Sequence, residues 1–341
     1  MCRNPMFAEQ WLDHNLPQKP KIIGSAKNYT LEMKKNLEEV VKKHSKKLLI
    51  LNCGHCIDCR LNKSREWATR CMLEAKEHQN KYFITLTYDN EHLPINEGVD
   101  ITTGEIIKTP TLKKEDLQNF WKRLRMHYER KYGIKNKLRY VGCGEYGDQL
   151  NRPHYHAIVF GLPIFDLKTD HKSKRGNMNY KSKEWQEIWG NGIVAIGDVT
   201  WESCAYTARY VMKKQTGLGK EIYKIENRES EFPCYSKRPA IAKNFFQENW
   251  QKIYDNDEIY IKTKDGVKGV KPARYFDKLF DVIDHESMNK IKRNRVENAE
   301  IRQLQLEKST DKDWADVIKD NEEGKDLKIK SLKRNFERGY I

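Results

Sequence analysis

The stretch Arg152-Pro153-His154-Tyr155-His156-Ala157-Ile158-Val159-Phe160-Gly161 has two histidines on either side of one aromatic residue, followed by an apolar run. The run predicts a β-strand, in which residues i and i+2 point to the same face. His154 and His156 would then project side by side, with Tyr155 on the opposite face. Two imidazoles so placed can share one divalent metal ion, although an isolated His-x-His is more often a pair of solvated side chains. The rest of the chain is needed to decide between the two.

The composition favours a nucleic acid as the partner. Of 341 residues, 64 are Lys or Arg and 49 are Asp or Glu, which gives a formal net charge of +15. Such an excess predicts a polyanionic partner. No apolar run approaches the ~20 residues that a membrane-spanning helix needs. The start of the chain, residues 1–7, lacks the apolar core of a signal peptide, so we expect a protein of the cytoplasm.

Three cysteines are spaced like metal ligands. Cys53, Cys56 and Cys59 lie three residues apart, and thiolates at this spacing can hold Zn²⁺, but a closed structural site needs a fourth ligand. Reduced cysteines without a metal are an equally acceptable interpretation. Eight cysteines in so long a chain are not a disulfide scaffold, which indicates a reducing compartment. The candidates for the fourth ligand of a structural zinc site are Cys2, Cys71, Cys234 and His55.

The strands around the two histidines suggest a third ligand. Residues 81–88 are aromatic and β-branched and predict a strand, and residues 138–145 and 193–199 predict two more. A turn over residues 146–153 would make residues 138–145 the antiparallel neighbour of the His154 strand. Glu145 would then lie across from the two histidines, with Asp148 as the second choice. The alternative for Glu145 is an ordinary surface residue of a hairpin.

Two helices are predicted from apolar spacing. One places Leu117, Phe120, Trp121, Leu124 and Tyr128 in a single stripe, which indicates core packing. The other runs from Thr200 to about Gln215. It would cluster Tyr206, Tyr210 and Lys213 on one side, away from the core, while the small residues Cys204, Ala208 and Val211 would dock on the sheet. Half-buried packing is the alternative role for the two tyrosines.

These groups together can carry out phosphoryl transfer. A metal ion held by two imidazoles and a carboxylate acts as a Lewis acid on a phosphate, and Mn²⁺ or Mg²⁺ suits such ligands. A tyrosine can attack the polarised phosphorus and form a covalent intermediate. A nearby ammonium such as that of Lys213 would favour the phenolate. Lys237 and Arg238, in the basic loop Cys234-Tyr235-Ser236-Lys237-Arg238-Pro239, are suited to contact DNA phosphates.

The chain resembles the HUH endonucleases. Three segments match the ordered motifs of that superfamily, and the nearest similarity is to replication initiation proteins of Microviridae, especially the gokushovirus group. The Met-Cys-x-x-Pro start, the cysteine segment and the Ser-Lys-Arg-Pro segment also resemble that group. The three motif segments are Phe83-Ile84-Thr85-Leu86-Thr87-Tyr88, Gly144-Glu145-Tyr146-Gly147 with the His154 strand, and Tyr206-x-x-x-Tyr210-x-x-Lys213.

The resemblance implies roles for these residues. His154, His156 and Glu145 would hold the metal, Tyr206 and Tyr210 would be nucleophiles, and Lys213 an accessory cation. Such initiators nick supercoiled duplex DNA at an origin, stay attached to the 5′ phosphate and leave a 3′ hydroxyl for the host replication machinery. The released single strand is then circularised.

The resemblance also implies a fold. It is an α+β fold with a five-stranded antiparallel sheet flanked by helices, of the palm or ferredoxin-like type. We therefore expect an N-terminal segment with the cysteines over residues 1–60, the endonuclease domain over 61–275 and a charged, mainly helical tail over 276–341. Two other functions remain open: a zinc-stabilised DNA-binding regulator without enzymatic activity, and a transposase or relaxase of the same superfamily.

Overall fold

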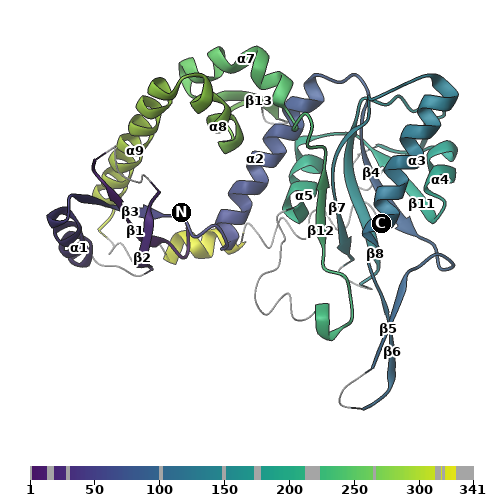
Figure 1. The fold of residues 1–341 in the computed structure, drawn as a ribbon, viewed down its shortest axis with the longest axis horizontal. Coiled ribbons are helices and arrows are strands. Elements are labelled where there is room, and N and C mark those ends of the chain that lie inside the picture. Colours follow the sequence, from purple (N-terminus) through teal and green to yellow (C-terminus); the bar gives the residue numbers. More distant parts are fainter. Residues whose placement is uncertain are drawn as a thin grey trace. The chain divides into compact units, whose positions relative to one another are not determined.

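The structure is a computed structural model, which describes residues 2–13, 19–27, 31–99, 103–147, 151–172, 178–211, 223–263, 266–311, 316 and 319–327 (Figure 1). The chain divides into two compact units, and each is described by itself. The first consists of Met1–Lys63 with Arg293–Glu337, and the second contains Ser64–Lys292. Helices α2 (Ile57–Lys76) and α9 (His285–Lys308) contribute residues to both units.

The first unit contains a small antiparallel sheet of three strands in the order β2-β1-β3. Phe7 and Ala8 of the central strand are buried, and so is Val41 of the neighbouring helix α1. A further helical stretch covers residues 319–327. The elements of this unit are β1 (Met6–Trp11), β2 (Lys21–Ser25), α1 (Leu31–Lys43) and β3 (Lys46–Leu51).

The second unit is built on an antiparallel sheet of seven strands in the order β12-β7-β8-β4-β11-β10-β9. The α+β class is confirmed, but the expectation of five strands is wrong. Both edges gain strands from segments whose polar sequences predict loops. The strands are β4 (Lys81–Tyr88), β7 (Arg139–Tyr146), β8 (Pro153–Phe160), β9 (Lys168–Lys172), β10 (Met178–Lys181), β11 (Gly192–Gly197) and β12 (Phe232–Tyr235).

One face of this sheet carries the aromatic core. Figure 1 shows helices α3 (Lys114–Tyr132) and α4 (Lys183–Trp189) on this face, and the predicted stripe of α3 is buried throughout. Because side chains alternate along a strand, Tyr155 of β8 points into this core. The two histidines that flank it must therefore point to the opposite face.

The opposite face is covered by helix α5 (Trp201–Val211), which packs on β7, β8 and β12. The predicted orientation of this helix is wrong. Tyr206 does not face away from the core: it is 9% exposed, and its hydroxyl reaches Glu145 on the sheet. Cys204 instead contacts Met72 of α2, with 3.8 Å between the sulfur atoms. Helix α5 thus has contacts on two sides, so the small residues and Tyr206 are both buried.

The remaining elements of the second unit lie outside the seven-stranded sheet. The expected hairpin around Gly98 and Gly104 is present as β5 (Ile95–Val99) and β6 (Ile106–Pro110). A second hairpin pairs β13 with β14, as the turn signal at Asp265-Gly266 predicts. The other bounds are α7 (Lys243–Asn256), β13 (Ile259–Thr263), β14 (Gly266–Val270) and α8 (Arg274–Ile283).

Candidate metal and nucleophile site

The β7–β8 pair places Glu145 directly opposite His154. One carboxylate oxygen of Glu145, Oε1, lies 2.8 Å from Nε2 of His154 and 2.9 Å from Nε2 of His156. Glu145 and His156 are buried, with side-chain exposures of 2% and 6%. The arrangement follows from the strand periodicity, which points all three side chains to the α5 face.

Each histidine ring is held from behind. The carbonyl of Arg152 can only accept, so Nδ1 of His154 donates to it at 3.0 Å, and Nε2 is the nitrogen that faces Glu145. Nδ1 of His156 lies 2.9 Å from the hydroxyl of Thr85, which pairs with His156 across β4 and β8. The ring of Phe83 stacks on that of His156 at 5.5 Å. Hydrogen bonds of this kind orient histidines that bind metals.

Tyr206 completes the cluster from helix α5. Its hydroxyl donates to Glu145 Oε1 at 3.0 Å and lies 3.4 Å from Nε2 of His156. The guanidinium of Arg209, one turn later, lies 5.7 Å from the centre of the Tyr206 ring. A phenol, two imidazoles and a carboxylate therefore converge on one point, with a cation beside the phenol.

The electrostatics keep Glu145 ionised. Burial alone would raise its pKa, but the charges of His156 and His154 and the hydrogen bonds from both rings lower the pKa to about 2. Burial opposes the charged form of His154, yet its hydrogen bond to Glu145 raises the pKa of that ring. The pKa of His156 is lowered, because burial outweighs the effect of Glu145.

The donor set fits a divalent metal ion. The ligand atoms of Glu145, His154 and His156 all lie within 4.8 Å of one another. The second carboxylate oxygen of Glu145, Oε2, is buried and has no hydrogen-bond partner among the described residues. A buried carboxylate oxygen without a donor is costly, and a cation would satisfy it. Two nitrogens and a carboxylate are suitable ligands for Mn²⁺, and also for Mg²⁺ or Zn²⁺.

Several predicted site residues are not described. The backbone of Tyr210 belongs to helix α5, but the position of its side chain is outside the described part of the structure. Lys213 and the alternative ligand Asp148 also lie outside the described residues. The sequence analysis did not identify Thr85 and Phe83 as supports of His156, or Arg209 as the cation beside Tyr206. The alternation of Phe83 and Thr85 along β4 was the available signal, because it puts both on the face of the histidines.

The four cysteines Cys2, Cys53, Cys56 and Cys59 form a separate cluster in the first unit, with all sulfur atoms within 4.8 Å of one another. Sγ of Cys2 lies 3.5 Å from Sγ of Cys53 and 3.6 Å from that of Cys56. In a tetrahedral Zn–S site with bonds near 2.3 Å, the sulfur atoms lie about 3.8 Å apart. The other candidates for the fourth ligand, His55, Cys71 and Cys234, are not part of this cluster.

The backbone around the cysteine cluster suits negatively charged sulfur. The amides of His55 and Cys56 donate to Sγ of Cys53 at 3.4 and 3.3 Å, and that of Cys53 donates to Sγ of Cys2 at 3.3 Å. Burial opposes the thiolate, but backbone N–H groups, with hydrogen bonds from neighbouring thiols, lower the pKa of Cys56 to about 6. Gly54 adopts φ 78°, a left-handed conformation that lets the chain turn between the first two ligands.

Lys237 and Arg238 are exposed after β12, at the edge of the seven-stranded sheet. Among the described residues, no helix is both long enough and apolar enough to cross a membrane.

Residues 81–215, which include the site, match the model of the "Replication-associated protein ORF2" family. The chain is 33% identical to "Replication-associated protein ORF2" of Spiroplasma virus 4 over 84% of this chain and 86% of that protein. It is 30% identical to "Replication-associated protein VP4" of Bdellovibrio phage phiMH2K, over 81% and 83% of the two chains. It is 32% identical to "Replication-associated protein ORF4" of Chlamydia phage 1, over 48% and 38%. No solved structure matches the chain.

Proposed function

The chain belongs to the ORF2 family of replication-associated proteins, and we propose that it starts phage DNA replication by nicking one strand of DNA at an origin. The DNA would be presented as a single strand exposed in the supercoiled duplex form. The family indicates the process, and the cluster of Glu145, His154, His156 and Tyr206 suggests the chemistry.

The observation that carries this proposal is the position of the Tyr206 hydroxyl, 3.0 Å from Glu145 Oε1 and 3.4 Å from His156 Nε2. A phenol that only packed would not need to approach three potential metal ligands. A divalent ion such as Mn²⁺ or Mg²⁺, held by Glu145, His154 and His156, would draw electron density from a phosphate and make the phosphorus more electrophilic.

The residues of the chain would then act as follows. The oxygen of Tyr206 attacks the phosphorus, and its proton leaves along the hydrogen bond to Glu145. The bond between phosphorus and the 3′ oxygen breaks, and that oxygen takes up a proton to become a 3′ hydroxyl. The 5′ phosphate stays bonded to Tyr206, which conserves the bond energy for rejoining. Arg209, and Lys213 in the same role, would stabilise the negative charge on the phenol oxygen and the phosphate.

The later steps use the second tyrosine. Tyr210 lies four residues after Tyr206 on one helix, and residues four apart share a helix face. Tyr210 would attack the regenerated origin after one round of synthesis by the host replication machinery, and the freed 3′ hydroxyl would attack the first phosphotyrosine. The released strand is then circular. This reaction takes place in the infected bacterial host cell.

The test is a cleavage assay on a single-stranded oligonucleotide that contains the phage origin and is labelled at its 3′ end. With Mn²⁺, a denaturing gel should show the labelled strand attached to protein, and EDTA should abolish this adduct. The variant with both Tyr206→Phe and Tyr210→Phe should form no adduct, while its DNA affinity stays nearly unchanged. Tyr260→Phe, at an exposed tyrosine of β13, is the matched control and should behave as wild type. Adducts in the double variant would refute the assignment.

We propose Zn²⁺ as the ion of the cysteine cluster, with a structural role. Four thiols in a closed set favour zinc over oxygen-seeking ions. The same cluster is the one feature that favours a zinc-stabilised DNA-binding regulator without enzymatic activity. That function would become the better one if folded, origin-binding protein cleaved nothing with any divalent ion. The relatives are named for replication, which favours an initiator over a transposase or relaxase.

A further inference from the structure

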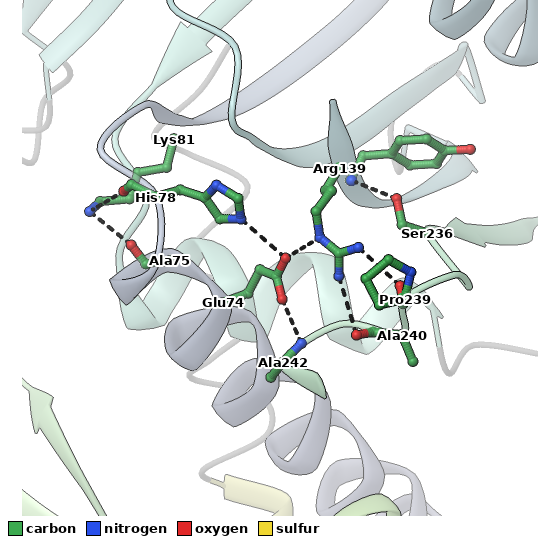
Figure 2. Close-up of polar contacts among 10 residues, drawn as sticks. Glu74, Ala75, His78, Lys81, Arg139, Ser236, Pro239, Ala240 and Ala242 are labelled. Carbon is green, nitrogen blue, oxygen red and sulfur yellow. Dashed lines mark hydrogen bonds and ion pairs between the residues drawn. The ribbon is translucent and has the colours of Figure 1, made fainter. Parts of the chain in front are cut away.

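The loop of residues 236–242, which carries Lys237 and Arg238, is held by an ion pair between two strand and helix residues far apart in sequence. Arg139 of β7 donates from Nη1 to the carbonyl of Pro239 at 3.0 Å and from Nη2 to that of Ala240 at 3.2 Å. Its Nε donates to Oε1 of Glu74 of α2. Figure 2 shows Glu74 between Arg139 and the loop, with the amide of Ala242 donating to its other oxygen. We call this pair the Glu74–Arg139 clamp.

Further bonds hold both ends of the same loop. Ser236 exchanges two hydrogen bonds with the backbone of Tyr140, through its amide at 2.9 Å and its hydroxyl at 3.1 Å. Arg70 of α2 donates from Nε and Nη2 to the carbonyl of Ile241, at 3.2 and 3.0 Å. Three successive carbonyls of the loop therefore accept hydrogen bonds from two guanidinium groups. The backbone is fixed, and the side chains of Lys237 and Arg238 are exposed.

The clamp is not a metal site, although Glu74, Glu77 and His78 lie close enough together to suggest one. Both oxygens of Glu74 already accept hydrogen bonds, from Arg139 and His78 on one and from Ala242 on the other (Figure 2). A cation would have to displace a guanidinium group. Burying a carboxylate and two guanidinium groups is costly, and a surface turn does not require it. The expense is accounted for if the shape of the loop matters.

Partly exposed aromatic rings adjoin the loop. The ring of Tyr235, the residue before the loop, lies 4.7 Å from that of Trp67 of α2. The guanidinium of Arg70 lies 4.4 Å from the Trp67 ring and 4.3 Å from that of Tyr275. Exposed cations beside aromatic rings are the combination that binds single-stranded nucleic acid, because phosphates meet the charges and unpaired bases stack on the rings.

The loop and the Tyr206 site belong to the same face of the sheet. Arg139 and Glu145 are six residues apart on β7, so their side chains share a face, and the site lies roughly 20 Å away along the strand. Tyr235 pairs with Val141 and is nearer still, at roughly 13 Å from the position of Glu145. A strand of DNA bound at the site can extend over this distance.

We propose that Lys237, Arg238, Tyr235 and Trp67 form a contact surface for single-stranded DNA, which the Glu74–Arg139 clamp holds in a fixed shape. This inference rests on the proposed function, because it assigns the path of the same substrate. Arg139 and Glu74 are positioning residues: they act on DNA only through the loop.

The first experiment measures binding of labelled oligo(dT), and of a labelled duplex, by fluorescence anisotropy over a range of salt concentrations. The variant with Lys237→Ala and Arg238→Ala should bind oligo(dT) more weakly, and its salt slope should fall by about 1.4, which corresponds to two phosphate contacts to a single strand. Tyr235→Leu should weaken binding by about fivefold or more. The matched control, Lys122→Ala with Arg130→Ala, removes two exposed cations from α3 on the other face and should change neither quantity.

The second experiment tests the clamp by a double-mutant cycle. Arg139→Lys keeps the charge but loses the forked donation to Pro239 and Ala240. It should weaken oligo(dT) binding, and in that background Lys237→Ala with Arg238→Ala should have a smaller effect than in the wild type. Purely additive effects would overturn the positioning role. If Arg139→Lys does not fold, the exposed variants alone decide the contact surface.

The remaining outcomes separate this inference from the proposed function. Wild-type binding of oligo(dT) by the Lys237 and Arg238 variant would overturn the contact surface, even if the adduct still forms at Tyr206. A loss confined to the duplex would overturn the assignment to single-stranded DNA. The tyrosine variants bear only on the nicking reaction.

Discussion

Thr85 is the residue whose role was hardest to foresee, since it binds no ligand itself. Its hydroxyl lies 2.9 Å from Nδ1 of His156 and faces that ring across the β4–β8 pair. Phe83, two residues earlier on the same face, stacks on the same ring. The ring of His156 is thus constrained in both its plane and its rotation. Such constraint keeps Nε2 directed at the position where a metal ion would bind.

We therefore predict that Thr85→Val lowers the affinity for Mn²⁺ by about 10- to 100-fold, the usual effect of removing the hydrogen-bond partner of a ligand. Metal titration by calorimetry measures this without any DNA. Thr85→Ser keeps the hydroxyl and should restore most of the affinity. Thr87→Val, on the same face of β4 opposite His154, is the control and should bind Mn²⁺ as wild type does. Equal affinity in Thr85→Val and wild type would show that the hydroxyl does not position the ring.

At the scale of elements, the sequence predicts well what local periodicity encodes. The spacing of His154 and His156 gives a shared strand face, and a tight turn puts Glu145 opposite. The buried stripe of α3 follows from its apolar spacing in the same way. These features depend on residues that are close in sequence, or on one strand pairing.

What could not be predicted depends on long-range contacts. Strands β9, β10 and β12 are short and polar, and they form because a neighbouring strand offers unpaired backbone groups. Helix α5 contacts both the sheet and α2, so its small residues do not reveal which side faces the sheet. Glu74 and Arg139 are 65 positions apart, and neither has a local pattern that points to the other.

The Glu74–Arg139 clamp joins α2, β7 and the loop of residues 236–242, and it predicts a pH dependence. Burial alone would raise the pKa of Glu74, but hydrogen bonds from His78, Arg139 and the amide of Ala242 lower it from 4.5 to about 2. A lowered pKa in the folded state stabilises the fold above the unfolded pKa. This contribution, roughly 3 kcal/mol, is lost as the pH falls from about 4.5 to 2.

Urea unfolding followed by tryptophan fluorescence checks this prediction. Glu74→Gln should be less stable than wild type at neutral pH, and the difference should shrink at about pH 3 as Glu74 becomes protonated in the wild type. Glu77→Gln is the matched control, because burial and the charge of Glu74 raise the pKa of Glu77 instead. It should not lose stability at neutral pH. A Glu74→Gln variant as stable as wild type at neutral pH would contradict the role of the clamp.

At the scale of the whole molecule, the two units differ in how they are stabilised. The second unit contains the large aromatic core between its sheet and α3 and α4. The first unit has a three-stranded sheet with few large buried side chains among its described residues, of which Phe7 and Val41 are examples. Units with so small a core usually need a metal or disulfides. The cysteines are free thiols, so a metal in their cluster is the available means.

Loss of zinc should therefore unfold the first unit and leave the second folded. Cys56→Ser removes one of four ligands, and the protein should lose its zinc, measured as one ion per chain in the wild type. Hydrogen exchange should accelerate strongly in β1 and β3, because structural zinc binding is coupled to folding. Exchange in β4 and β8, which carry the candidate active site, should stay slow. His55→Ala is the matched control: His55 lies between two ligands but outside the cluster, so this variant should keep its zinc and its protection. Unchanged exchange in β1 and β3 of zinc-free protein would mean that the cysteines do not stabilise this unit. Fast exchange in β4 and β8 as well would mean that the two units unfold together.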